Sequence, residues 1–136
     1  MPSRMQSLDT NILLRFMLND DATHFAMIVD ALSRPKAQFF IPDVALIEAV
    51  HVLQTYYGRD RQNISRLVTI LFKPLNIHGN SELFASVIEI WQKHPALSFT
   101  DCYLAEQAKQ ENRAPLLTFD KRLAKQHPQT QELSSV

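Results

Sequence analysis

The alternation of short β-forming runs with longer stretches of helical periodicity limits most strongly how this chain can fold. Residues 38–41 are rich in β-forming side chains, and Pro42 ends this run. Further strands are predicted at residues 5–8, 75–77 and 115–119. Because helical segments separate the strands, the pattern predicts a parallel sheet covered by helices on both faces.

The helical segments are recognised by apolar residues that recur three and four positions apart. In the longest, Asp43 is predicted to be the N-cap and Gly58 to mark the end, and the periodic apolar residues are Leu46, Val50, Leu53 and Tyr57. The other helices are predicted near residues 12–17, 21–32, 60–71, 81–91, 103–110 and 121–125.

Length and composition indicate a single domain. The 136 residues are 46% hydrophobic, which is enough for one sizeable core. We therefore expect an α/β fold over residues 1–136, a three-layer α/β/α domain whose central, mostly parallel sheet has four or five short strands. The polar tail, residues 127–136, is expected to form a last short strand around 132–136 or to be disordered.

Charge and motif content exclude several classes of function. The 14 basic and 14 acidic residues give a formal net charge of zero, which disfavours nucleic-acid binding by bulk charge. The single Cys102 excludes an internal disulfide and a cysteine zinc site. Glycine-rich phosphate loops are absent. With no signal-peptide or membrane-spanning pattern, we expect a cytoplasmic protein that does not enter a membrane.

Three aspartates stand where a parallel sheet usually binds ligands, at the carboxyl ends of strands. Asp9 follows the first predicted strand, Asp120 follows the fourth, and Asp101 lies in the first turn of a helix. Each also has an ordinary explanation. Asp9 or Asn11 could cap the first helix, Ser98 and Asp101 fit a capping box, and Asp120 could cap the last helix.

Glu48 is the fourth acid of interest. Between Asp43 and Arg59 it is the only acidic or Lys/Arg side chain, in a helix whose other residues are mostly apolar. A carboxylate buried in such a helix would require a salt bridge or a bound cation. The alternative is a position on a thin exposed stripe with Gln54 and Thr55.

Taken together, the four acids predict a metal site. Carboxylates that converge repel one another unless a cation neutralises them, and oxygen ligands suit Mg²⁺ or Mn²⁺. Such a site can bind a phosphate oxygen and activate water for attack on phosphorus. The predicted ligands, direct or through water, are Asp9, Glu48, Asp101 and Asp120.

Four sequence segments also resemble a known family. They are Leu8-Asp9-Thr10-Asn11-Ile12-Leu13-Leu14-Arg15, Ile47-Glu48-Ala49-Val50, Thr100-Asp101, and Leu117-Thr118-Phe119-Asp120-Lys121. In this order, across residues 5–125, they resemble the PIN-domain nucleases, and most of all the bacterial VapC-type toxins of toxin–antitoxin systems. Ser7 departs from the pattern, because a Gly or an apolar residue is common there.

The resemblance implies an Mg²⁺- or Mn²⁺-dependent endoribonuclease whose acidic cluster is Asp9, Glu48, Asp101 and Asp120. It further implies that Asn11, Thr100 and Thr118 contact these ligands or the substrate. The implied partners are structured RNA, often tRNA or rRNA, a cognate antitoxin, and a second copy in a homodimer.

The remaining candidates are two basic residues and one coincidence of spacing. Lys121 and Arg122 directly follow Asp120, so we expect them to contact the RNA backbone. The spacing of Glu48 and His51 matches di-iron helical bundles, but the chain has no second copy of it. Two rival functions stay open: a non-catalytic RNA- or protein-binding module whose acids are caps and salt bridges, and a structure-specific DNA nuclease of the same fold.

Overall fold

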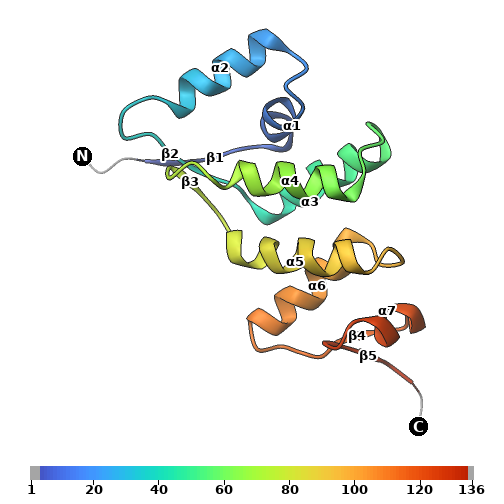
Figure 1. The fold of residues 1–136 in the computed structure, drawn as a ribbon. Coiled ribbons are helices and arrows are strands. Elements are labelled where there is room, and N and C mark those ends of the chain that lie inside the picture. Colours follow the sequence, from blue (N-terminus) through green and yellow to red (C-terminus); the bar gives the residue numbers. More distant parts are fainter. Residues whose placement is uncertain (1–3, 135–136) are drawn as a thin grey trace. The chain divides into compact units, whose positions relative to one another are not determined.

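The computed structural model describes residues 4–134, and it divides into an N-terminal unit, Met1–Ser81, and a C-terminal unit, Glu82–Val136 (Figure 1). The N-terminal unit contains β1 (Met5–Ser7), α1 (Thr10–Leu18), α2 (Ala22–Leu32), β2 (Gln38–Phe40), α3 (Asp43–Thr55), α4 (Arg61–Leu71) and β3 (Ile77–His78), and its last residue, Ser81, begins α5. The C-terminal unit contains the rest of α5 (Ser81–Lys93), then α6 (Phe99–Gln110), β4 (Leu116–Thr118), α7 (Lys121–Gln126) and β5 (Thr130–Glu132).

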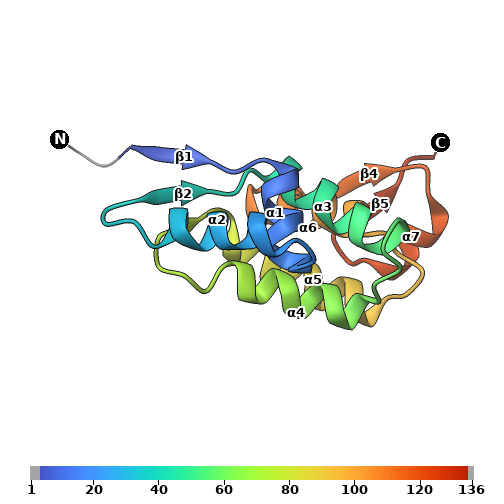
Figure 2. The same cartoon turned by 90° about the horizontal axis from the view of Figure 1, so that it is seen from above.

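The N-terminal unit is built on three parallel strands in the order β1-β2-β3. Ser7 pairs with Phe40, and Phe40 pairs in turn with His78. Figure 2 shows β1 and β2 side by side. The parallel pairing follows from the helices between the strands, because a chain that crosses over through a helix re-enters the sheet in the same direction. The predicted parallel arrangement is therefore present in this unit.

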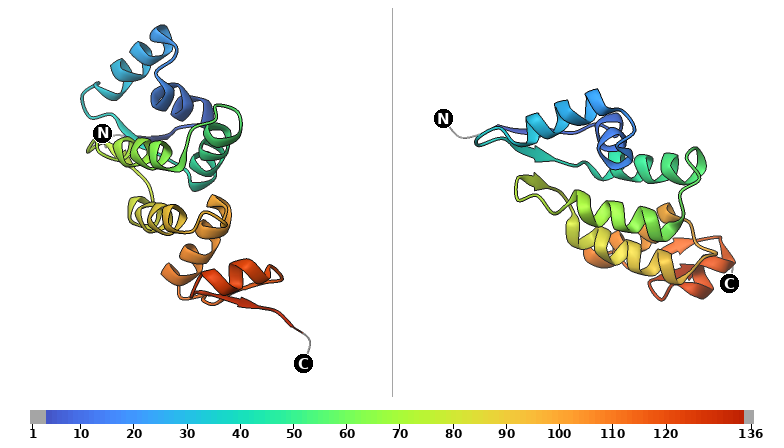
Figure 3. Two further views of the ribbon diagram at one scale, coloured as in Figure 1. Left: turned by 45° about the vertical axis from the view of Figure 1, so that its right-hand side comes forward. Right: turned by 45° about the horizontal axis from the view of Figure 1, so that its top comes forward.

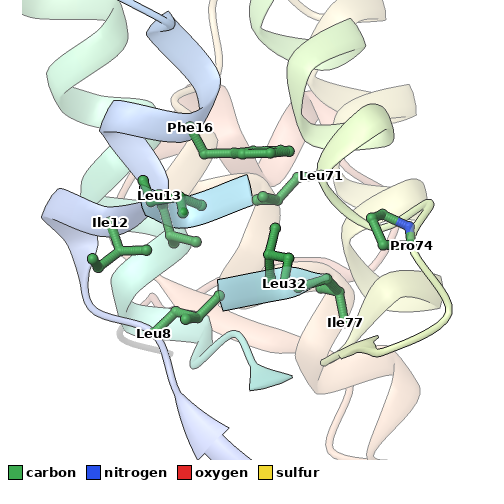
Figure 4. A pocket seen from close by; sticks show the side chains of 9 residues that line it. Leu8, Ile12, Leu13, Phe16, Leu32, Leu71, Pro74 and Ile77 are labelled. Atoms are coloured by element: carbon green, nitrogen blue, oxygen red, sulfur yellow. The ribbon is translucent and has the colours of Figure 1, made fainter. Parts of the chain in front are cut away.

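The core of this unit lies between its helices and strands. Leu46, Val50 and Leu53 of α3 are completely buried, as the predicted periodicity requires. Figure 4 shows apolar side chains from four elements and their flanking residues converging on a small pocket of about 10 Å³: Leu8, Ile12, Leu13, Phe16, Leu32, Leu71, Pro74 and Ile77. A space this small and apolar indicates close packing.

The start of α3 corrects one prediction. Pro42, rather than Asp43, is the N-cap of α3, and it makes no side-chain cap hydrogen bond. Asp43 is the first helical residue, and its carboxylate instead accepts hydrogen bonds of 2.8 and 2.9 Å from the Asn80 side-chain amide. The predicted end is close to the observed one, since α3 ends at Thr55 and Gly58 adopts the left-handed conformation, with φ of 63°.

The C-terminal unit joins two helices to a parallel pair of strands, β4 and β5, with α7 packed beside them (Figure 3). Its core is aromatic. Trp91 is completely buried, and its ring meets that of Phe99 at a centroid distance of 5.1 Å in an edge-to-face arrangement. The hydrogen bonds of the five described strands thus form one three-stranded and one two-stranded parallel set.

Two strands lie a few residues away from their predicted positions. β3 is Ile77–His78 rather than 75–77, because residues 74–77 form a turn in which the Ile77 amide donates to the Pro74 carbonyl at 3.1 Å. Leu75, in that turn, is 97% exposed. The last strand is Thr130–Glu132 rather than 132–136, and residues 135–136 lie outside the described part of the chain.

None of the helices between residues 4 and 134 combines the length and apolar character that crossing a membrane requires.

Candidate active site

Asp9 is placed at the start of α1, two residues after β1 ends. It is the N-cap of this helix, and its Oδ1 atom accepts a hydrogen bond of 2.9 Å from the Ile12 amide. The capping explanation is therefore confirmed for Asp9. The carboxylate is exposed, and the cap uses one of its two oxygens, so a second ligand can still be bound by Oδ2.

Of the two alternatives for Glu48, the structure shows the exposed position rather than the buried one. The buried residues of α3 lie on one stripe, and Glu48 faces away from it with His51 and Thr55. The signal was present in the sequence. Glu48 lies two positions from both Leu46 and Val50, and residues two positions apart do not share a helix face. Burial therefore supplies no argument for a cation at Glu48.

The structure does bring Glu48 close to the Asp9 segment. The Thr10 hydroxyl lies 3.2 Å from Glu48 Oε2 and donates to it, with the Ala45 carbonyl oxygen at 3.4 Å. α1 and α3 thereby form a hollow of about 600 Å³, which we call the α1–α3 hollow. It is lined by Asp9, Thr10, Asn11, Leu14, Arg15, Glu48, Val52, Tyr56 and Tyr57.

A guanidinium is fixed in the same hollow. Arg15 donates to Asp20 at 3.0 Å and to the Tyr57 hydroxyl at 3.1 Å. The hydrogen bond with Tyr57 raises the pKa of Arg15, partial desolvation opposes this effect, and the negative charge of Asp20 adds to it. The α1–α3 hollow thus combines two carboxylates with a permanently charged cation.

Sequence analysis missed Thr10, Tyr56 and Tyr57 as residues of this site. Thr10 lies inside the Asp9-Thr10-Asn11 motif, and its hydroxyl is the group that connects α1 to Glu48. Tyr56 lies eight residues after Glu48, on the same side of α3, with Val52 between them. Helical periodicity measured from Glu48 would have identified it.

Asp101 and Asp120 lie in the C-terminal unit. Asp101 is half-buried in the first turn of α6, and its amide donates to Ser98 Oγ at 3.1 Å, so Ser98 is the N-cap. Asp120 is the N-cap of α7, and its Oδ1 accepts hydrogen bonds from the amides of Arg122 and Leu123 at 2.9 and 3.1 Å. The capping explanation is thus confirmed for Asp120.

The polar neighbours of these two aspartates are placed as follows. Thr118 Oγ1 accepts a 3.0 Å hydrogen bond from the Asp120 amide, so it supports the turn that presents the carboxylate. Thr100 is exposed in the first turn of α6. Lys121 and Arg122 are exposed in the first turn of α7.

The predicted four-acid cluster stays a prediction. In the N-terminal unit, Asp9 and Glu48 line one hollow. Within residues 4–134, no group of three or more His, Cys, Asp or Glu side chains is arranged to hold a metal ion.

A pair of ionisable side chains is buried elsewhere, in the C-terminal unit, and the sequence patterns did not indicate it. Glu106 of α6 is 7% exposed and His127 is 1% exposed. His127 Nε2 lies 3.2 Å from Glu106 Oε2, without the alignment of a hydrogen bond, and Nδ1 accepts from the Gln129 amide at 3.0 Å. Desolvation lowers the pKa of His127, although the Glu106 carboxylate opposes this effect.

Comparison with known proteins identifies the family. The PIN domain model matches residues 7–127, which is most of the chain. This chain belongs to the PIN domain family. It is also 27% identical over 124 residues to a VapC ribonuclease of Aquifex aeolicus (strain VF5), a match that covers 89% of this chain and 91% of the relative. No solved structure matches the chain significantly.

Membership of the PIN domain family confirms the resemblance noted in the sequence and the α/β/α fold class that it implied. The four motifs that carry the resemblance all lie within the matched residues. The domain match and the relative together support a nuclease of the VapC type.

Proposed function

We propose that this PIN-domain protein is an Mg²⁺- or Mn²⁺-dependent endoribonuclease and the toxin of a type II toxin–antitoxin pair. The observation that carries the proposal is the α1–α3 hollow, where Asp9 and Glu48 are exposed to an incoming ligand beside Arg15. Exposed acids beside a fixed cation suit a phosphodiester substrate, because the acids can bind metal while the guanidinium attracts the phosphate.

The donor set of the hollow fits a hard divalent cation. Such ions take oxygen ligands, and Mg²⁺ in particular is commonly held by one or two carboxylates together with water. Asp9 has Oδ2 beyond its cap bond, and the Glu48 carboxylate is oriented by the Thr10 hydroxyl. We assign the ligand role to Asp9 and Glu48, and propose that Asp101 and Asp120 complete the set.

When bound, the ion would stabilise negative charge on the phosphate and lower the pKa of water for hydrolysis. The chain's own residues position the substrate. Arg15 stays protonated and has N–H groups beyond those that contact Asp20 and Tyr57. Lys121 and Arg122 are exposed next to Asp120, where they would contact RNA phosphates. Asn11, Thr100 and Thr118 are proposed to contact the acids or the substrate.

The family resemblance supplies the remaining parts of the proposal. The substrate would be structured RNA, such as tRNA or rRNA, and a cognate antitoxin would inhibit the site. The protein would act in the cytoplasm as a homodimer. We take residues 1–136 as one PIN domain, since the family match spans both compact units.

One observation favours a second candidate function. Asp9 and Asp120 are both N-caps, which is a sufficient structural reason for an acid at each position. In this alternative the chain is a non-catalytic RNA- or protein-binding module. The nuclease requires the negative charge of these two aspartates to bind metal, whereas the non-catalytic module requires the residues only as helix caps.

Asparagine substitutions separate these alternatives, because Asn caps a helix about as well as Asp but lacks the charge. Asp9→Asn, Asp120→Asn and Asp101→Asn are each purified and tested for cleavage of total RNA and purified tRNA with Mn²⁺, beside an EDTA control. We expect each variant to lose roughly a hundredfold or more of the activity, with melting temperatures close to that of the wild type.

Asp60→Asn is the matched control, because Asp60 also caps a helix, α4, by accepting from the Asn63 amide at 2.7 Å. It should retain full cleavage. Equal activity in all four variants would contradict the nuclease proposal and point to a contaminating ribonuclease.

Metal binding can be tested without any substrate. Millimolar Mn²⁺ should raise the melting temperature of the wild type, since an ion that binds only the native state stabilises it. The rise should be lost in Asp9→Asn and kept in Asp60→Asn. An unchanged wild-type melting temperature, together with absent RNA cleavage, would favour the non-catalytic module.

A further inference from the structure

Tyr56 is an aromatic side chain that the core does not use. It is the C-cap residue of α3, and its amide donates to the Val52 carbonyl at 2.9 Å, so the backbone position is fixed. The residue is nevertheless 79% exposed. Because most of the residue is exposed, burial of its ring contributes little to the stability of the fold.

The Tyr56 ring packs against the neighbouring ring of Tyr57. The rings of Tyr56 and Tyr57 meet edge to face, with centroids 4.9 Å apart and planes at 72°. The Tyr57 hydroxyl is held by Arg15, which is itself held by Asp20. The Tyr56 ring therefore packs against a neighbour that is itself held in place, and a restricted ring loses less entropy on binding.

Tyr56 also lines the same hollow as the proposed metal ligands. It is eight residues beyond Glu48 on α3, which corresponds to about 12 Å along the helix axis. The hollow therefore presents carboxylates at one part, an exposed aromatic ring at another, and the Arg15 guanidinium among the lining residues. Proteins that bind single-stranded nucleic acid combine positive charge for the backbone with aromatic rings on which bases stack.

We propose that Tyr56 is a stacking platform for an unpaired nucleotide next to the scissile phosphate, whose backbone is contacted by Arg15. This inference rests on the proposed ribonuclease function and assigns the contact with an unpaired base to Tyr56. A base inside a duplex is already stacked on both sides, so it cannot use the ring without leaving the helix.

Binding is measured by fluorescence anisotropy with two labelled probes, a short oligouridylate and an RNA duplex of the same length. Millimolar Ca²⁺ replaces Mg²⁺ so that binding is recorded without rapid cleavage. Tyr56→Ala should weaken binding of the single strand by roughly tenfold, as expected for one lost stacking contact. The duplex should be bound equally by both proteins.

The conservative variant and a matched control identify the cause. Tyr56→Phe keeps the ring and should bind the oligouridylate like the wild type. Leu75→Ala removes another strongly exposed apolar side chain of the N-terminal unit, one that does not line the hollow, and should change nothing.

A spectroscopic signature gives a second readout. The only native tryptophan, Trp91, is completely buried, so a new emission change in Tyr56→Trp would report the new ring. Oligouridylate should quench this emission, and the duplex should not.

Unchanged single-strand affinity in Tyr56→Ala, or an equal loss for both probes, would overturn the stacking role. Cleavage of RNA by the wild type is assayed separately, so the ribonuclease proposal would survive that result. If the wild type neither binds the oligouridylate nor cleaves RNA with Mn²⁺, both proposals fail.

Discussion

Helices α3 and α6 each carry one glutamate of interest, and the two behave in opposite ways. Glu48 stands alone among mostly apolar residues, yet it is exposed. Glu106 lies in a helix with several polar residues, yet it is 7% exposed and lies next to the buried His127. The composition of a helix therefore did not indicate which acid is buried.

The difference has a simple physical cause. α3 buries one stripe, and Glu48 lies off it. α6 buries Cys102, Ala105 and Glu106 together, where the segment that follows α7 brings His127 against it. The burial of a carboxylate is thus decided by what packs on its own face of the helix. An exposed acid can take part in binding and catalysis, whereas a buried acid in this chain is part of the packing.

The largest expected effect separates the two glutamates by activity. Glu48→Gln should reduce RNA cleavage roughly a hundredfold or more, because it removes a charge proposed to bind metal, while the amide can still accept from Thr10. Glu106→Gln should retain cleavage, since Glu106 is not among the residues that line the α1–α3 hollow. The readout is the initial cleavage rate at saturating Mn²⁺. Similar losses in both variants would break the distinction between a functional and a structural acid.

The second prediction concerns stability, where substitution of Glu106 should have the larger effect and substitution of Glu48 the smaller. Glu106→Ala should lower the free energy of unfolding by about 0.5–3 kcal/mol, because it truncates a buried side chain and removes its packing contacts. Glu48→Ala should change it by no more than about 0.5 kcal/mol, as expected for an exposed position. Urea denaturation monitored by Trp91 fluorescence measures both. A larger cost for Glu48→Ala than for Glu106→Ala would refute the assignment.

The third prediction is a pH dependence. Burial lowers the pKa of folded His127 below its ordinary value of 6.5, so the unfolded chain takes up the proton first as the pH falls. The stability contribution of His127 is therefore fully present above pH 6.5, and it declines as the pH falls from 6.5 through the folded pKa.

This decline is measured by urea denaturation at a series of pH values, and NMR titration of the imidazole gives the folded pKa. His127→Gln should remove the decline, whereas His51→Gln, at an exposed position of α3, should keep it. A folded His127 pKa above 6.5 would show that the Glu106 charge outweighs burial.

The smallest effect concerns the orientation of Glu48. Thr10→Val removes the hydroxyl that donates to Oε2, while the shape of the side chain is kept. We expect roughly a threefold loss of cleavage, since one hydrogen bond at an exposed site contributes about 1 kcal/mol or less. Thr10→Ser, which keeps the hydroxyl, should restore the rate. Unchanged cleavage in Thr10→Val would show that Glu48 is positioned by other contacts.

Much of the fold follows from local patterns in the sequence. The helix capped by Asp21 and the strand at residues 38–40 lie where the sequence predicts them, because N-caps and β-forming runs act over a few residues. One error occurred where a distant residue intervenes. Asp43 was predicted as an N-cap, but Asn80 binds its carboxylate from the end of the N-terminal unit.

For the candidate site too, the sequence indicated the local features but not the contacts between distant residues. The motifs around Asp9 and Asp120 were identified from their position after a strand, and both aspartates begin helices in the structure. The sequence did not indicate that Thr10 contacts Glu48 or that Tyr57 holds Arg15, since these pairs are 38 and 42 residues apart.

By itself, the sequence determined the elements, the parallel direction of the strands, the family and the candidate acids. These properties depend on short-range periodicity and on motifs that can be compared directly between proteins. Only the tertiary structure decided that Thr10 contacts Glu48, that Glu106 and His127 are buried together, and that Tyr56 shares a hollow with Asp9. Burial and proximity are set by which elements pack against one another, and no local pattern carries that information.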